Sequence, residues 1–87
     1  MAYEIIFHKD AEKGLRSLRS QKSLYRRLLE FFDELARDPR AVSAKKLLGE
    51  WSGCYSYRAG PIRIIYEIHE HRLMIHILEV GPREDIY

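Results

Sequence analysis

The last third of the chain contains three runs typical of β-strands, the first alternating aromatic residues with small or charged ones and the other two largely apolar. Residues 55–59, 62–68 and 73–80 are rich in β-branched and aromatic side chains, which predicts three strands. Gly60-Pro61 separates the first two runs, and Glu70-His71 separates the second from the third. Because both breaks are short, we expect the three strands to form an antiparallel sheet in chain order.

Residues 3–8 show the same alternation and predict a further strand of this sheet. Two helices are predicted after it. The first runs from residue 11 to about residue 19 with Asp10 as its N-cap, and the second ends at about residue 37, before Pro39. Their hydrophobic residues recur at helical spacing: Ala11, Leu15 and Leu18 in the first helix, and Leu24, Leu28, Phe31, Leu35 and Ala36 in the second.

The segment between residues 40 and 53 has no single period. It is either a loop or, from four small or apolar residues, one or two helical turns that end at Gly49. These residues are Ala41, Ala44, Leu47 and Leu48. The fold class is therefore α+β, with an N-terminal strand, a two-helix hairpin and a three-stranded antiparallel sheet in one domain, residues 1–87. We expect the helices to cover one sheet face and to leave the other, partly charged face open to a ligand.

Charge is distributed unevenly along the chain. The formal net charge of +2 is too small to indicate a nucleic-acid partner by itself. Between residues 13 and 29, however, there are six basic residues and no acidic one. Such a run forms either a solvated helix face or a contact with a polyanion. The six residues are Lys13, Arg16, Arg19, Lys22, Arg26 and Arg27.

The cysteine content and the apolar runs bear on localisation. Cys54 is the single cysteine and forms no internal disulfide, which is typical of a reducing compartment. No apolar run approaches the roughly 18 residues of a membrane span, and Glu4 places a charge where a signal peptide would be apolar. We therefore expect a cytoplasmic protein that makes no membrane contact.

The Gly60-Pro61 break sets an expected register for the strands on either side of it. A two-residue turn places Ala59 opposite Ile62, and Arg58 directly across from Arg63 on the same sheet face. Like charges in this arrangement repel each other. An anion bound between the two guanidinium groups would relieve that repulsion, so we expect an anion site here.

Two stretches resemble the RelE/ParE superfamily of toxins, and in particular the RelE-type mRNA interferases of bacterial and archaeal toxin–antitoxin modules. The segment KKLLGEWSGCYSYRAGPIRIIYEI is similar to the superfamily's Lys-x-Leu, tyrosine strand, Arg, Gly turn, second Arg and Ile-Tyr. The tail EVGPREDIY is similar to its Val-Gly-x-Arg followed by an Asp and a Tyr. The predicted order of elements agrees with the RelE-like fold, so the resemblance spans nearly the whole chain.

The resemblance implies a toxin of a type II toxin–antitoxin system. Such a toxin enters the ribosomal A site beside the 16S rRNA and cuts mRNA there by metal-free attack of the 2′-hydroxyl, with no cofactor. Translation stops as a result, and a cognate antitoxin silences the toxin. Two other functions stay open: a ParE-like toxin that inhibits DNA gyrase without cleaving RNA, and a binding module with no toxic activity.

By position, the resemblance assigns six residues to the site. Arg63, Arg83 and Tyr87 would be catalytic, and Arg58, Lys45 and Lys46 would bind RNA, with no metal ligand among them. Ser56 is a departure, because many relatives have a basic residue at that position.

These residue types suit cleavage of RNA, which carries its own nucleophile. The enzyme has to deprotonate the 2′-hydroxyl, neutralise the crowded phosphorane and assist departure of the 5′-oxygen. Guanidinium groups match phosphate geometry and stay charged at neutral pH, so Arg58 and Arg63 are the expected phosphate clamps. Tyr87 is the expected general base, since surrounding cations lower the pKa of a phenol. Arg83 would stabilise the leaving oxygen or supply its proton.

Structural alternatives exist for the same residues. Arg58 and Arg63 are also consistent with solvated strand residues that pair with Glu67 or Glu79. Tyr55, Tyr57 and Tyr66 suit either base stacking or packing within the sheet.

The histidines allow two further interpretations. His69, His71 and His76 would lie close enough to hold zinc if the strand continued through His71, although the stretch is typical of a turn. A histidine is also an alternative to Tyr87 as the general base.

Overall fold

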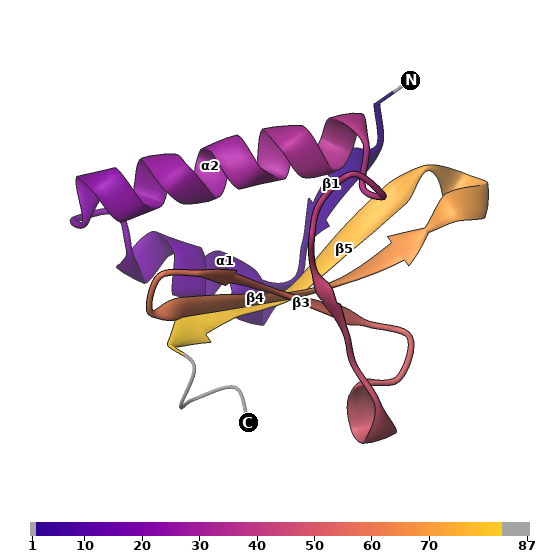
Figure 1. Cartoon of the computed structure of the whole chain (residues 1–87). Helices are drawn as coiled ribbons and strands as arrows, with labels where there is room; N and C mark the ends of the chain where they lie inside the picture. The colour runs from indigo at the N-terminus through magenta and orange to yellow at the C-terminus, as the bar shows by residue number, and fades with distance from the viewer. Residues whose placement is uncertain (1, 83–87) are drawn as a thin grey trace.

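The computed structural model describes residues 2–82, which form two helices over a five-stranded sheet (Figure 1). In chain order the elements are β1 (Glu4–Phe7), α1 (Lys9–Ser17), α2 (Lys22–Arg37), β2 (Lys45–Lys46), the 3₁₀ helix η1 (Gly49–Trp51), β3 (Tyr55–Ala59), β4 (Ile62–His69), the 3₁₀ helix η2 (Glu70–Arg72) and β5 (Met74–Pro82). The α+β class, the helix hairpin and the three antiparallel C-terminal strands are confirmed, and these strands belong to a sheet that has five strands in all. Within the described residues, no helix is long and apolar enough to cross a bilayer.

The strands lie in the order β1-β5-β4-β3-β2. The predicted N-terminal strand joins the sheet, and it pairs with β5 in parallel, whereas all other neighbours are antiparallel. The chain must therefore cross from β1 to the far side of the C-terminal hairpins, and the two helices fill this crossover.

Of the two alternatives for residues 41–48, a loop or helical turns, the helical turns are wrong. Lys45–Lys46 instead forms the edge strand β2, which pairs with Ser56 and Tyr55 of β3. The Leu47 N–H donates to the Cys54 carbonyl at 2.9 Å and extends this pairing by one residue. Leu47 is buried in the structure, and an extended chain is what brings it down onto the sheet. Tertiary packing thus overrides the weak helical pattern of this segment.

Helix α1 begins earlier than the sequence indicates. His8, not Asp10, is the N-cap residue, and Asp10 lies within the first turn. The His8 N–H continues the β1–β5 pairing by donating to the Ile77 carbonyl at 2.9 Å, and the His8 carbonyl accepts from Glu12 at 2.9 Å. The same residue therefore ends the strand and starts the helix, and the carboxylates of Asp10 and Glu12 still favour the positive end of the helix dipole.

The main hydrophobic core lies between the helices and one sheet face, which we term the helix-covered face (Figure 1). Phe31 and Phe32 of α2 connect the two layers. The Phe31 ring stacks on Tyr57 with centroids 3.9 Å apart, and Phe32 meets Phe7 edge to face at 5.1 Å. Because neighbouring strand residues point to opposite faces, Tyr57 on the helix-covered face places Arg58 on the opposite face, which we term the far face.

A second, smaller core covers the middle of the far face. It contains the buried residues Leu47, Cys54 and Ile65, with Trp51 and Leu78 packed against them. A register shift between Ile65 and Tyr66 in the pairing of β4 with β5 places Leu78 opposite this irregularity. The expectation that the whole far face is open is therefore wrong, since the segment around η1 covers its apolar centre. What stays accessible is its charged end.

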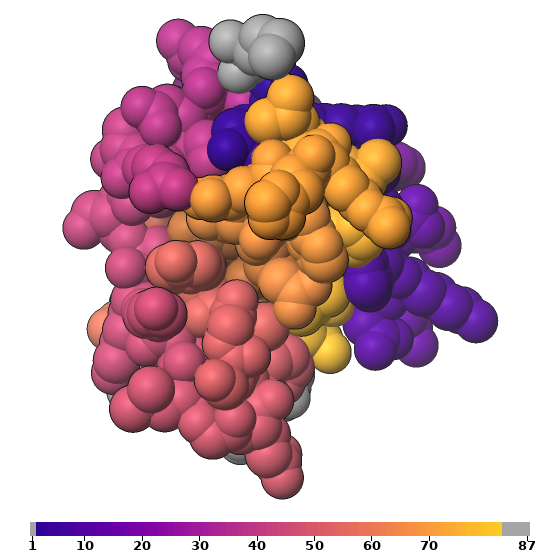
Figure 2. All heavy atoms as spheres, turned by 90° about the vertical axis from the view of Figure 1, so that its right-hand side faces the viewer, coloured from indigo at the N-terminus to yellow at the C-terminus, as the bar shows by residue number. Residues whose placement is uncertain are grey.

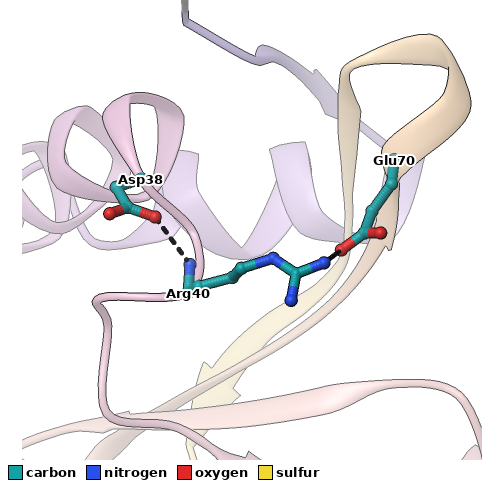
Figure 3. A network of polar contacts seen from close by, with 3 residues as sticks. All are labelled: Asp38, Arg40 and Glu70. Carbon is teal, nitrogen blue, oxygen red and sulfur yellow. Dashed lines mark hydrogen bonds and ion pairs between the residues drawn. The ribbon is translucent and has the colours of Figure 1, made fainter.

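A polar network fastens the chain after α2 to the β4–β5 turn (Figure 3). The Arg40 backbone N–H donates to Asp38 Oδ1 at 3.2 Å, and the Arg40 guanidinium forms an ion pair with Glu70. Both side chains of the pair are at least half exposed, so the pair adds little stability. Figure 2 shows the two connected regions side by side on one face of the molecule, with the η1 segment below the β4–β5 turn.

Candidate functional site

A tight turn between β3 and β4 sets the geometry of the candidate site. Gly60 has a φ of 61°, a value that side-chain-bearing residues rarely adopt. Pro61 follows with its φ locked near −65° by its ring. Positive φ and then negative φ is the combination found in a type II′ hairpin turn, so Pro61 is compatible with the second central position.

The turn places two arginines opposite each other, as the sequence predicts. Ala59 pairs with Ile62, and Arg58 pairs directly with Arg63. Directly opposed residues of an antiparallel pair share a face, so both guanidinium groups project from the far face. Arg58 is exposed and Arg63 is half-buried. Two cations held in this way form a site of high positive potential.

Lys45 adds a third cation to the same hollow. It lies opposite Ser56, which shares the far face with Arg58 and Arg63. The hollow is lined by Ser43, Ala44, Lys45, Ser56, Tyr57, Arg58 and Arg63. Ser56 itself is buried and uncharged. Lys45 of the neighbouring edge strand therefore supplies the positive charge at this place.

Lys46 lies on the other side of the sheet. It pairs with Tyr55, whose ring stacks on Tyr66 within the core layer. Lys46 lines a separate hollow with residues 68–72 of the β4–β5 turn. Of the two lysines expected to bind RNA, the structure therefore brings only Lys45 together with the arginine pair.

The carboxylates expected to neutralise the arginines have other neighbours. Glu67 accepts from His69 Nε2 at 2.5 Å. Burial raises the pKa of Glu79, and the negative charge of Asp10 raises it further. Among residues 2–82, none of the ion pairs involves Arg58. Within residues 2–82, Arg58 is therefore solvent-exposed and forms an ion pair with neither of these carboxylates.

Strand β5 ends next to the arginine pair. Gly81 pairs with Arg63, and Pro82 pairs with Ile62. Arg83 and Tyr87, the other two expected catalytic residues, lie outside the described residues. In the sequence, Arg83 directly follows Pro82, the last residue of β5.

The strand tyrosines belong to the core. Tyr66 is 1% exposed, and burial, followed by the charges that Tyr55 and Tyr57 would carry, raises its pKa to about 12. Tyr57 is covered by Phe31 at 3.9 Å. Packing rather than base stacking is thus the role of Tyr57 and Tyr66, and Tyr66 keeps its proton at every physiological pH.

The histidines form a cluster that the sequence does not predict in full. His8 Nε2 and His76 Nδ1 are 2.8 Å apart, and the rings of His69 and His76 have centroids 4.3 Å apart. Burial lowers the pKa of His76, and the neighbouring His69 and His8 lower it further. In the described part of the chain, no group of three or more His, Cys, Asp or Glu side chains is arranged to hold a metal ion.

His8 is the member of this cluster that sequence reasoning missed. The sequence contains one indication of its place: the period-two pattern of residues 3–8 puts His8 on the side of the strand opposite Ile5 and Phe7. Pairing with His76 follows only from the parallel alignment of β1 with β5, in which Ile6 lies opposite His76.

Comparison with known proteins identifies relatives along nearly the full length. A family model described as the ParE toxin of the type II toxin–antitoxin system parDE matches residues 5–87. Toxin RelG of Mycobacterium tuberculosis is 34% identical over 88 residues, an alignment that covers 100% of this chain and 98% of RelG.

Solved structures of similar chains share the fold. The archaeal RelE–RelB complex from Pyrococcus horikoshii contains a chain that is 37% identical, with a TM-score of 0.77, over 95% of this chain and 97% of that one. The toxin–antitoxin complex RelBE2 from Mycobacterium tuberculosis contains one that is 31% identical, with a TM-score of 0.79, over 95% and 93%.

Proposed function

This chain belongs to the RelE/ParE superfamily of toxins from type II toxin–antitoxin systems, and from that membership we propose that it is a ribosome-dependent mRNA endonuclease. It cuts mRNA in the ribosomal A site and thereby stops translation. The observation that carries the proposal is the cationic hollow on the far face, where Arg58 lies directly across from Arg63 and Lys45 lines the same space. This arrangement suits the phosphate backbone of RNA.

The proposed reaction is an in-line transfer within the RNA. The 2′-oxygen forms a bond to phosphorus while the bond from phosphorus to the 5′-oxygen breaks. Arg58 and Arg63 hold the phosphate oxygens, where charge accumulates in the transition state. Lys45 holds the adjacent backbone through its charge.

The proton transfers involve the residues beyond β5. Tyr87 takes the proton of the 2′-hydroxyl, and a cationic surrounding favours the phenolate that this role needs. Arg83 stabilises the negative charge on the departing 5′-oxygen, which takes a proton from solvent water, while the proton that Tyr87 removed passes to solvent. The products are a 2′,3′-cyclic phosphate and a 5′-hydroxyl, and the atoms balance without an added reactant.

The test is cleavage of mRNA on programmed ribosomes, followed by primer extension. We expect Arg63→Ala to reduce the single-turnover rate by about 10²–10³-fold, the loss typical of a group that stabilises developing charge. Tyr87→Phe should reduce it by roughly 10²–10⁴-fold, because the base is removed. Arg72→Ala, at an exposed position of η2, is the matched control and should cleave at the unaltered rate. Unaltered cleavage by Arg63→Ala would falsify the proposed role of the arginine pair.

A ParE-like function is the second candidate, because the matching family model is itself described as a ParE toxin. In that case the chain would inhibit DNA gyrase by protein contacts and would leave RNA intact. Loss of supercoiling activity with purified gyrase, together with intact mRNA on ribosomes, would select this alternative.

A cognate antitoxin is the proposed protein partner. The similar chains from Pyrococcus horikoshii and Mycobacterium tuberculosis were solved in RelE–RelB and RelBE2 complexes. We expect the antitoxin to be acidic where it meets the basic face between Lys13 and Arg27 or the arginine site, and to act by covering or displacing the active-site end of the chain. Binding that weakens as salt increases would support this contact, and binding indifferent to salt would contradict it.

A further inference from the structure

Arg27 of α2 extends the positive charge of the site beyond the sheet. A Cβ atom placed on Gly60 would lie 3.8 Å from Arg27 Nη1, so this guanidinium lies against the turn that joins β3 to β4. Figure 1 shows the first half of α2 on the same side of the molecule as this turn. Arg27 is exposed, and none of the ion pairs between residues 2 and 82 involves it.

The position of Arg27 follows from the packing of its helix. The next residue, Leu28, is completely buried, and Phe31 one turn later stacks on Tyr57 of β3. These contacts fix the rotation of α2 against β3. The 3.8 Å from Arg27 Nη1 to a Cβ placed on Gly60 is an ordinary van der Waals distance, so the guanidinium lies beside the turn without crowding it.

The β3–β4 turn is at the end of the sheet, where groups on either face can lie close to it. Arg58 and Arg63 project from the far face, while Arg27 approaches from the helix-covered face. A flexible polyanion that is held by the arginine pair and passes over the tip meets the third guanidinium next. Before Arg27, every charged residue of α2 is basic, namely Lys22 and Arg26, whereas Glu30 lies one helical turn after it.

We propose that Arg27 is a positioning residue that binds a backbone phosphate flanking the scissile one and so directs the mRNA across the β3–β4 turn. This inference rests on the proposed function. A single RNA strand fits this path because it is flexible and carries a phosphate at every nucleotide, and the planar fork of arginine matches that group. An acidic segment of a protein partner is the competing occupant, and the experiment separates the two.

The experiment measures single-turnover cleavage on programmed ribosomes with a series of mRNAs. Each mRNA carries one uncharged methylphosphonate at a different linkage flanking the cut. The toxins compared are the unaltered chain, Arg27→Ala, and the control Arg26→Ala, which removes the same charge from the adjacent exposed position of α2.

On unmodified mRNA, we expect Arg27→Ala to raise the toxin concentration for half-maximal rate by roughly fivefold, the upper range for an exposed charge pair. The maximal rate should stay within about twofold, since Arg27 does not contact the reacting atoms. Arg26→Ala should have less than half of this effect. On one mRNA of the series, the unaltered chain should already need a higher concentration for half-maximal rate. On that mRNA, Arg27→Ala should raise the concentration no further, because the phosphate charge it binds is already absent.

Three outcomes would overturn the inference. If the unaltered chain cleaves none of the mRNAs, the proposed function is wrong, and so is the inference that rests on it. If it cleaves but Arg27→Ala behaves like Arg26→Ala, or weakens every mRNA by the same factor, Arg27 contacts no defined phosphate. If Arg27→Ala cleaves at the unaltered rate but, in a parallel titration, binds the antitoxin more weakly than Arg26→Ala does, the surface belongs to the protein partner.

Discussion

Single residues decide how closely the layers of this molecule approach each other, and Gly14 is the clearest case. A Cβ atom placed on Gly14 would lie 1.8 Å from the Val80 carbonyl oxygen of β5, far inside any allowed contact. The obstructing atom belongs to the backbone of a buried strand and cannot rotate away. Glycine in the middle of α1 weakens the helix, yet it lets α1 lie directly on β5.

We therefore expect Gly14→Ala to destabilise the protein, although alanine favours the helical conformation by roughly 1 kcal/mol. Moving α1 away from β5 to accommodate the methyl group should cost about 1–3 kcal/mol more than this gain. Urea unfolding followed by circular dichroism measures the difference. Gly81→Ala, on β5 itself, is the matched control, because a Cβ there has nothing within 4 Å. Equal stability of the two variants would contradict the close-approach argument.

At the scale of elements, the histidine cluster joins three segments that are distant in the sequence. His8 comes from the junction of β1 and α1, His76 from β5 and His69 from the end of β4. The charges that act on His76 include those of His69, His8, Glu67 and Arg72, and of these only Glu67 favours its protonation. The cluster therefore stabilises the β1–β5–β4 arrangement when His76 is neutral.

Stability should consequently depend on pH. In the unfolded chain, His76 takes up its proton near pH 6.5, whereas in the folded chain its pKa is lower. Below pH 6.5 the unfolded state thus binds more protons, and the free energy of unfolding falls as the pH decreases toward the folded pKa; above pH 6.5 this contribution is fully present.

Chemical unfolding between about pH 5 and pH 8 tests this dependence. His76→Gln should reduce the pH slope, while His71→Gln, at an exposed position of η2, should retain it. A slope that is unchanged in His76→Gln would show that another group causes the dependence. The raised pKa of Glu79 has the opposite effect, because its contribution to the free energy of unfolding falls as the pH rises through its titration range.

At the scale of the whole molecule, the sheet has cores on both faces. The helices pack over most of one face, and the segment between β2 and β3 covers the centre of the other with Leu47 and Cys54. Ile64 and Ile65 are neighbours on β4, both fully buried, and they belong to different cores. The second core holds β2 against β3, and β2 carries Lys45 into the cationic hollow.

We expect Ile65→Val and Ile64→Val to cost similar free energy, about 0.5–1.5 kcal/mol each, because each removes one buried methyl group. If both cores unfold together, each variant should show a single transition with an unchanged urea slope. A negligible loss for Ile65→Val would mean that the second core contributes little to folding. In that case the position of Lys45 would not depend on it.

Local patterns in the sequence are sufficient for the elements whose signals are short-range. The alternation of residues 55–59 and 62–68 and the Gly60-Pro61 break determine the β3–β4 hairpin, and with it the pairing of Arg58 and Arg63. The end of α2 before Pro39 is likewise a local effect, since proline disfavours the helical conformation of the residue before it. The cationic pair at the candidate site is therefore predictable from neighbouring residues alone.

Only the tertiary structure decides what depends on contacts between distant residues. His8 and His76 are 68 positions apart, and nothing near either of them in the sequence indicates a parallel β1–β5 pairing. Lys45 and Lys46 look equivalent in the sequence, but pairing with β3 sends one to each face of the sheet. Arg27 reaches Gly60 because the burial of Leu28 sets the rotation of α2. Backbone propensities act over a few residues, whereas packing selects the one arrangement that buries all apolar faces at once.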